Sequence, residues 1–260
     1  MLTNHESTND NALLTALEEY AIESSIVKVT GSEYLHYVLD ENVQIHGGNG
    51  FVKDYPAERH YRDSRVNRIF EGTNEINRLL ISGMLVRRGL QGHFPLVAAA
   101  KKLQDEILSP PQTSSPDSSP LEKQYAAVTM FKKVSLATLG LAMQNYGEKL
   151  TDQQEILSFV SDILMDTYAS ESVVLRAQRA AATSTATAKL HEDTAALFVN
   201  DAANRVEVAA KAAIAAMTEG DTLRTHLAAL RRLLKVSPVN TVALRRGLAA
   251  AAVQKAGYTF

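Results

Sequence analysis

Apolar side chains recur along most of the chain at the three- and four-residue intervals that are typical of amphipathic helices. The clearest run covers residues 12–40, and its apolar positions are Leu13, Leu14, Leu17, Tyr20, Ala21, Ile26, Val29, Tyr34, Leu35 and Val38. No segment shows the two-residue alternation of a half-buried strand over a useful length. The pattern therefore predicts an all-α protein.

Capping residues and glycines set the limits of the predicted helices. Thr73 has the position of an N-cap for a helix that runs to about Arg88, with Gly89 as its stop. Two segments, 119–122 and 151–154, have the form of a capping box, in which a side chain at each end satisfies the other's backbone N–H. The helices expected in the second half of the chain cover residues 120–149, 152–189, 192–219, 222–235 and 241–256.

One segment marks a domain boundary. Residues 109–120, SPPQTSSPDSSP, contain four prolines and five serines, a composition that favours an extended linker over a packed helix. We therefore expect a helical domain over residues 1–108 and a second, antiparallel helical bundle over residues 121–260. The alanine-rich faces of the second block allow close helix approach, as such a bundle requires.

Composition narrows the classes of function. Lysine and arginine number 27 against 29 aspartate and glutamate, so no charge excess indicates nucleic-acid binding. The chain has no cysteine, and its seven histidines show no paired metal-ligand spacing, so we assign no metal site. The start of the chain is polar rather than signal-like, and no apolar run reaches 18 residues. We expect a soluble intracellular protein.

The segment of the sequence that most clearly indicates catalysis places a carboxylate beside a glycine. The segment R-I-F-E-G-T-N-E-I places Glu71 before Gly72 at the start of a predicted helix. Ile69 and Phe70 would desolvate the carboxylate, and Gly72 would let a substrate approach the backbone closely. Such a carboxylate is suited to take a proton from a bound substrate. The alternative is a solvent-exposed glutamate at the start of a helix.

A glycine-rich turn lies upstream in the segment Q-I-H-G-G-N-G-F. Gly47, Gly48 and Gly50 match neither a Rossmann fingerprint nor a P-loop, because no strand precedes them and no Gly-Lys-Ser follows. On local grounds the turn is a chain reversal between helices. Its alternative role is to hold a cofactor against the substrate of Glu71.

The order and spacing of these segments resemble the C-terminal helical domain of the acyl-CoA dehydrogenases, flavoenzymes that desaturate acyl-CoA thioesters. The resemblance implies that Glu71 is the base, that Gly72 helps to bind the thioester and that FAD accepts the hydride. It also implies that a neighbouring subunit's FAD is contacted by Gln44, Ile45, His46, Gly47 and Gly48. Thr73, Asn74 and Glu75 match the segment that touches the subunit's own FAD.

The second block is similar to the extension of the very-long-chain branch of that family, and the ending S-P-V-N-T-V-A-L-R-R resembles bacterial relatives. The implied partners are an acyl-CoA substrate, an electron-transfer flavoprotein and a second copy in a homodimer, with peripheral membrane association less well supported. The family also uses an N-terminal helical domain and a middle β domain. We therefore expect a truncated enzyme that is inactive alone. The alternative is a non-catalytic helical module that dimerises or docks onto a homologue.

Overall fold

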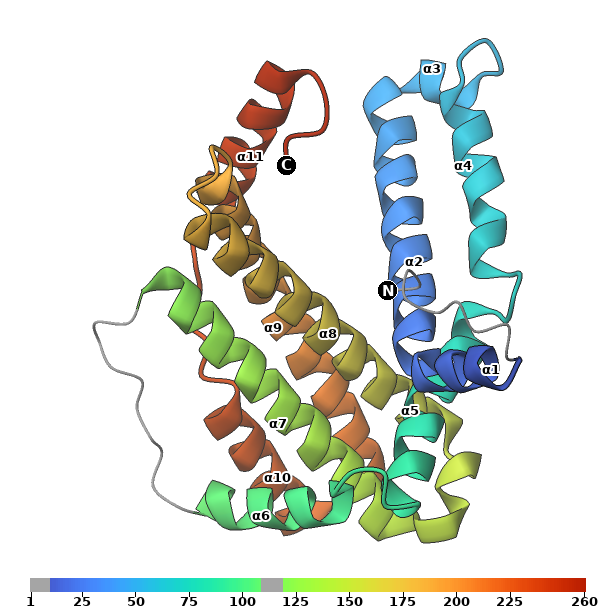
Figure 1. Ribbon diagram of the computed structural model, residues 1–260, viewed down its shortest axis with the longest axis vertical. Coiled ribbons are helices and arrows are strands. Elements are labelled where there is room, and N and C mark those ends of the chain that lie inside the picture. The colour runs from blue at the N-terminus through green and yellow to red at the C-terminus, as the bar shows by residue number, and fades with distance from the viewer. Residues whose placement is uncertain (1–9, 109–118) are drawn as a thin grey trace. The chain divides into compact units, whose positions relative to one another are not determined.

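The structure is a computed structural model of the chain and describes residues 10–108 and 119–260. Every regular element in these two ranges is a helix, and they contain no strand (Figure 1). The predicted all-α fold is therefore confirmed. By their internal contacts the residues divide into two compact units, residues 1–87 and residues 88–260.

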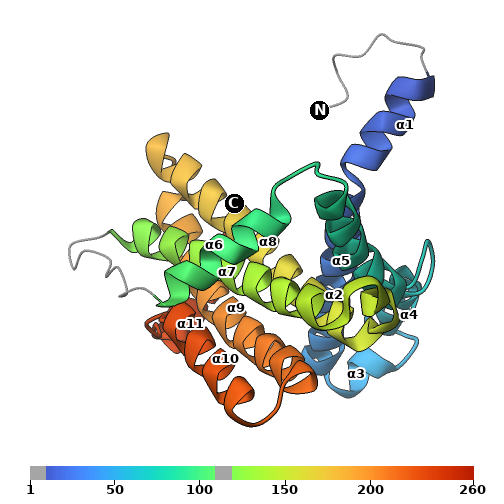
Figure 2. The same cartoon turned by 90° about the horizontal axis from the view of Figure 1, so that it is seen from below.

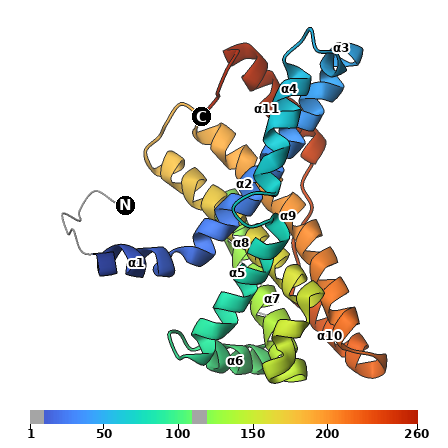
Figure 3. The same ribbon diagram turned by 90° about the vertical axis from the view of Figure 1, so that its right-hand side faces the viewer.

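The first unit is built on a hairpin of two helices, α2 and α4, and α5 follows at its base. Its elements are α1 (Asp10–Glu19), α2 (Ala21–His46), α3 (Gly48–Phe51), α4 (Ala57–Arg65), the 3₁₀ helix η1 (Val66–Arg68) and most of α5 (Asn74–Leu90). α4 packs along α2, and α3 lies at the tip where the chain turns between them (Figures 1 and 3). The helix expected over residues 12–40 is thus two helices, which meet at Tyr20.

The tip of the hairpin depends on glycine. α2 ends at Gly47, whose φ of +58° is a conformation that side chains disfavour. Gly50 is buried, and a Cβ there would lie 2.3 Å from the carbonyl oxygen of Val43. The turn can therefore close onto α2 only with glycine at position 50.

The two ends of α5 test the predicted cap and stop. The Thr73 hydroxyl accepts a hydrogen bond from the Ile76 N–H at 3.2 Å, so the predicted N-cap is confirmed. Gly89 is not the stop, because α5 continues to Leu90, and the left-handed residue that follows the helix is Gly92, which has φ +79°. Gly89 instead allows close packing, since a Cβ there would lie 2.5 Å from Leu96 Cδ2.

The second unit is a bundle of long helices. Its further elements are α6 (Leu96–Leu108), α7 (Pro120–Tyr146), the 3₁₀ helix η2 (Gly147–Asp152), α8 (Gln154–Ala182), α9 (Ala188–Met217), α10 (Gly220–Leu233) and α11 (Thr241–Lys255). α7, α8 and α9 pack against one another, and α10 runs beside α9 (Figure 2). Their core includes Phe131, Val174, Val199 and Val206, each fully buried. This arrangement confirms the predicted second helical bundle.

α6 belongs with the second unit, although the linker composition predicts that residues 1–108 form one domain. Leu96 and Leu103 of α6 are buried, and Glu106 forms an ion pair with Lys133 of α7. Most of the expected linker, residues 109–118, lies outside the described residues. The division at that linker remains a prediction.

The two expected capping boxes have different outcomes. At the start of α7 the Ser119 N–H donates to Glu122 Oε2 at 2.6 Å, and the Glu122 N–H donates to Ser119 Oγ at 3.3 Å. The second expected box, at 151–154, is wrong. η2 occupies residues up to Asp152, and α8 begins at Gln154 with no side-chain cap because Leu150 draws the preceding segment into the core.

One helical segment of the described chain, Pro120–Asp152, is long and apolar enough to cross a membrane. The segment is not an uninterrupted apolar run, because Lys132 and Lys133 lie within it. Half of its most apolar window is buried within the structure, as is usual for the core helix of a bundle. Its apolar character is explained by α7 side chains that fill the core, including Val128, Phe131 and Val134.

Candidate functional site

The candidate base lies on a short loop between η1 and α5. Glu71 has φ +53° and Gly72 has φ +78°, so two consecutive residues adopt left-handed conformations. For a residue other than glycine this conformation costs roughly 1–2 kcal/mol. In the part of the chain that the structure describes, no hydrogen bond or ion pair holds the exposed Glu71 carboxylate. The loop backbone therefore sets where the Glu71 side chain begins, and within the described residues no partner orients its carboxylate.

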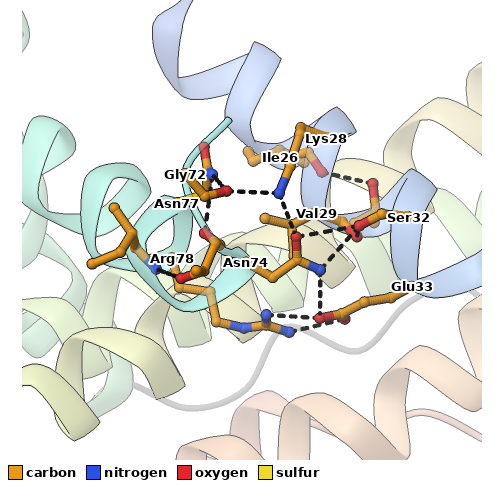
Figure 4. A network of polar contacts seen from close by, with 12 residues as sticks. Ile26, Lys28, Val29, Ser32, Glu33, Gly72, Asn74, Asn77 and Arg78 are labelled. Atoms are coloured by element: carbon orange, nitrogen blue, oxygen red, sulfur yellow. Dashed lines mark hydrogen bonds and ion pairs between the residues drawn. The ribbon is translucent and has the colours of Figure 1, made fainter. Parts of the chain in front are cut away.

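The Gly72 carbonyl is the point at which the loop is held. Lys28 Nζ of α2 and Asn77 Nδ2 of α5 each donate a hydrogen bond of 2.8 Å to this oxygen (Figure 4). A Cβ on Gly72 would lie 3.0 Å from Asn77 Nδ2. Glycine at position 72 therefore permits both the left-handed backbone and the close approach of the Asn77 amide.

Asn74 joins the start of α5 to α2 and has no exposed surface. Its Oδ1 accepts from Lys28 Nζ at 2.8 Å, and its Nδ2 donates to Ser32 Oγ at 2.9 Å and to Glu33 Oε1 at 3.2 Å (Figure 4). A buried amide whose polar atoms are all partnered fixes the geometry of its surroundings.

An ion pair completes this polar network. Arg78 of α5 donates hydrogen bonds of 2.8 and 2.9 Å to the two carboxylate oxygens of Glu33. Burial raises the pKa of the Glu33 carboxyl, but the hydrogen bonds and charge of Arg78, helped by Asn74 and Arg68, outweigh burial and hold the pKa below its ordinary value. Glu33 is therefore charged in the folded protein at neutral pH.

The surroundings of Glu71 differ from the sequence-based expectation. Ile69 is 54% exposed and Phe70 is 47% exposed, so within this unit they do not enclose the carboxylate. They leave it beside an open depression of about 320 Å³ on the same unit. The depression is lined by Lys28, Gly31, Ser32, Leu35, Asn67, Phe70 and Glu71. A desolvated carboxylate would require a further surface to cover this depression.

The residues expected to contact the subunit's own FAD differ in how far they are exposed to solvent. The Thr73 hydroxyl caps α5, and Glu75 is exposed at the first turn. A hydrogen bond from its own backbone N–H lowers the pKa of Glu75 against the opposing effect of burial, and the Thr73 hydroxyl and Arg78 lower it further. Asn74, in contrast, has no surface with which to meet a cofactor. Its side chain holds the loop instead.

The second expected cofactor segment, Gln44–Gly48, lies at the other end of α2 (Figure 3). All five of its residues are exposed, and Ile45 is 81% exposed. No atom lies within 4 Å of where a Cβ would stand at Gly47 or Gly48. Lys28 and Gln44 are 16 residues apart on one helix, which corresponds to about 24 Å. The structure does not bring this segment and Glu71 together within one unit.

A larger apolar cavity in the second unit is a competing location for a site. It has a volume of about 330 Å³ and lies among α6, α7 and α10. Its lining includes His226 and no carboxylate, so it lacks the chemistry that Glu71 offers. Burial lowers the pKa of His226. In the described ranges, no three metal-ligating side chains of His, Cys, Asp or Glu converge.

Sequence reasoning missed the residues that hold the loop. Lys28, Ser32 and Glu33 stand within an otherwise apolar helix pattern, and their partners Asn74 and Arg78 follow more than 40 residues later. A polar stripe on a core-forming helix is the signal that could have identified them, because buried polar groups need partners.

Two family models match most of the chain. A model described as "Acyl-CoA dehydrogenase, C-terminal domain" matches residues 6–85, and a second model with the same description matches residues 130–232. A probable acyl-CoA dehydrogenase of Bacillus subtilis (strain 168) is 45% identical over 245 residues, which cover 94% of this chain and 41% of that protein. The chain belongs to the acyl-CoA dehydrogenase family.

Two further members of the family extend the comparison. The crystal structure of an acyl-CoA dehydrogenase complexed with FAD, from Bacillus anthracis, matches with a TM-score of 0.89 and 42% identity over 95% of this chain and 42% of that one. A subunit of the caffeyl-CoA reductase–Etf complex of Acetobacterium woodii is 46% identical over 66 residues, 25% of this chain and 16% of that protein. This chain thus spans about two fifths of the length of its Bacillus relatives.

Proposed function

We propose that this chain is the C-terminal part of an FAD-dependent acyl-CoA dehydrogenase in which Glu71 removes the α-proton of an acyl-CoA thioester. The observation that carries the proposal is the unpaired Glu71 carboxylate on a backbone that is held at the next residue by two donors. A base must be free to accept a proton and must start from a defined place, and Glu71 joins an unpaired carboxylate to a backbone that is held beside it.

The residues present fit the cofactor. Gly47 and Gly48 leave open space at an exposed turn, where a bulky anionic group can approach the backbone closely. Thr73 and Glu75 border the base from the start of α5. FAD, when bound, supplies the acceptor for the hydride that leaves the β-carbon as Glu71 takes the α-proton, so the substrate gains a double bond.

The same geometry supports a homodimer. A separation of about 24 Å along α2 places the glycine turn far from the base of its own chain. The turn is therefore suited to a second copy's FAD, whereas Thr73 and Glu75 serve the FAD beside Glu71. An electron-transfer flavoprotein is the proposed electron acceptor, supported by the Acetobacterium woodii relative that is named as part of an Etf complex.

Activity requires more than these 260 residues. Glu71, Ile69 and Phe70 are exposed here, and a base for a weakly acidic proton needs a dry site. The Bacillus subtilis relative is more than twice as long, so its additional residues can provide the covering surface. We propose that the isolated chain does not turn over acyl-CoA. An intracellular location, supported by the lack of cysteine, completes the proposal.

The test uses a chimera in which this chain replaces the matching part of the Bacillus subtilis relative. Glu71→Gln should leave FAD bound but slow the reduction of the flavin by acyl-CoA about 10²–10⁴-fold, because glutamine cannot accept the proton. Glu58→Gln on α4 is the matched control and should reduce its flavin at the unmodified rate. An undiminished rate in Glu71→Gln would rule out Glu71 as the base.

A non-catalytic helical module is the second candidate. α2 exposes apolar side chains that the first unit leaves uncovered, among them Tyr37, Val38 and Ile45. These could dock onto a homologue without any catalysis. A chimera that folds and dimerises but remains colourless would favour the module, whereas retained flavin absorbance would favour the enzyme.

A further inference from the structure

The position of the candidate base has no support from its own side chain. The Glu71 carboxylate makes no hydrogen bond or ion pair within the described residues. The backbone at Glu71 and Gly72, both left-handed, sets the direction in which the Glu71 side chain leaves the loop. Whatever fixes this backbone also fixes the point from which the carboxylate can reach a substrate.

Lys28 of α2 joins the Gly72 carbonyl of this loop to the buried side chain of Asn74. Its ammonium group donates to the Gly72 carbonyl and to Asn74 Oδ1, each at 2.8 Å (Figure 4). Asn74 is in turn held by Ser32 and Glu33 of the same helix as Lys28. The loop is thus attached to α2 at two successive points.

Lys28 and Glu71 also line the same open depression, although no ion pair joins them. Because the ammonium group donates to Gly72 and Asn74, it acts on the loop rather than on the carboxylate. A neutral side chain of similar length would fill the same space but would leave the Gly72 carbonyl with Asn77 as its remaining donor and Asn74 Oδ1 without the Lys28 bond. The loop therefore depends on the hydrogen bonds that the ammonium group donates rather than on the volume of the side chain.

We propose that Lys28 is the positioning residue of the Glu71 base, and that its bond to the Gly72 carbonyl fixes the loop conformation from which Glu71 reaches the substrate. This inference rests on the proposed function. It assigns to α2 a role in the proton-transfer step that none of the expected site residues fills.

The first experiment uses the 260-residue chain and needs no cofactor. Hydrogen exchange followed by mass spectrometry should show faster exchange of the backbone amides at residues 72–77 in Lys28→Met than in the unmodified chain. Lys28→Arg, which keeps a charged donor, should restore the protection. Lys53→Met, which removes an exposed lysine from the same unit, should leave it unchanged. Unchanged exchange at 72–77 in a folded Lys28→Met chain would overturn the proposal.

The second experiment uses the chimera and separates positioning from stability. Lys28→Met should lower the rate constant for flavin reduction at saturating acyl-CoA about a hundredfold, with little change in the half-saturating concentration. The double variant Lys28→Met/Glu71→Gln should be no slower than Glu71→Gln alone, because Lys28 acts through Glu71. Additive losses in the double variant would contradict this role.

The two hypotheses fail in different ways. If Glu71→Gln reduces flavin at the unmodified rate, the proposed function fails whatever Lys28 does. If Glu71→Gln is slow but Lys28→Met is fast, the positioning role alone fails. Ile81→Val, which trims a buried side chain of α5 away from the loop, is the stability control and should keep the unmodified rate constant.

Discussion

The Arg78 guanidinium meets the Glu33 carboxylate through two parallel hydrogen bonds of 2.8 and 2.9 Å, which tie the first turns of α5 to the middle of α2. The pair is only partly open to water, since 16% of the Arg78 side chain and 29% of the Glu33 side chain are exposed. Paired, forked geometry of this kind is stronger than a single exposed ion pair.

Removal of one partner of this ion pair should lower the stability of the first unit. Arg78→Met leaves the partly buried Glu33 carboxylate without its strongest donors, and we expect the free energy of unfolding to fall by about 1–3 kcal/mol. Urea unfolding, resolved by hydrogen exchange of peptides from residues 21–87, measures the change. Arg59→Met on α4 is the control. A loss as large in Arg59→Met would show that the Glu33 contact is not the cause.

The contribution of Glu33 should depend on pH. The folded-state pKa of Glu33 is lowered, so its stabilisation is complete above the ordinary carboxyl pKa and is lost as pH falls through the lowered folded-state pKa. The stability deficit of Glu33→Gln relative to the unmodified chain should therefore be largest near pH 7 and shrink in acid. A deficit that stays constant from neutral to acidic pH would contradict this assignment.

The tip of the hairpin offers a matched pair of glycine substitutions. Gly50→Ala would place a Cβ 2.3 Å from the Val43 carbonyl oxygen, and we expect it to destabilise the first unit by about 1–3 kcal/mol. Gly48→Ala meets no atom within 4 Å and should leave the free energy of unfolding unchanged. Thermal melts of the two variants provide the comparison, and equal melting temperatures would show that the turn relaxes around the added methyl group.

Limited proteolysis tests the predicted linker. The composition of residues 109–120 predicts that the first cut falls between Ser109 and Pro120. Because Leu96 and Leu103 are buried in the second unit, we expect the two fragments to stay associated after the cut. Size-exclusion chromatography under native conditions measures this association, and Leu103→Ala should weaken it. Fragments that separate at once would show that α6 is not held by the second unit.

The sequence predicted those features that depend on neighbouring residues. The cap at Thr73 and the capping box at Ser119 were both predictable, because each is a contact over three positions. Four of the five helices expected in the second bundle begin and end within four residues of the observed bounds, whereas the helix expected over 152–189 ends at Ala182. Local polar chemistry and apolar periodicity together determine these elements.

Features that depend on tertiary contacts could not be predicted. Gly89 looked like a stop, but it lies inside α5 where Leu96 packs against its backbone. The expected box at 151–154 gave way to a 3₁₀ helix that buries Leu150. The hydrogen bonds that bury Asn74 join it to Lys28 and Ser32, which lie 46 and 42 residues away. No local pattern links positions so far apart.

The length of α2 determines how far apart its two ends lie. One end of this helix carries the residues that hold the Glu71 loop, and its other end carries the exposed glycine turn. Each residue inserted between Glu33 and Gln44 would advance the turn by about 1.5 Å and rotate it by roughly 100° about the helix axis. Such an insertion would move the glycine turn relative to the Glu71 loop and would also shift the face of α2 against which α4 packs. The number of residues in α2 therefore sets the distance and the rotation between the Glu71 loop and the glycine turn. This number constrains the sequence as much as the identity of any single side chain does.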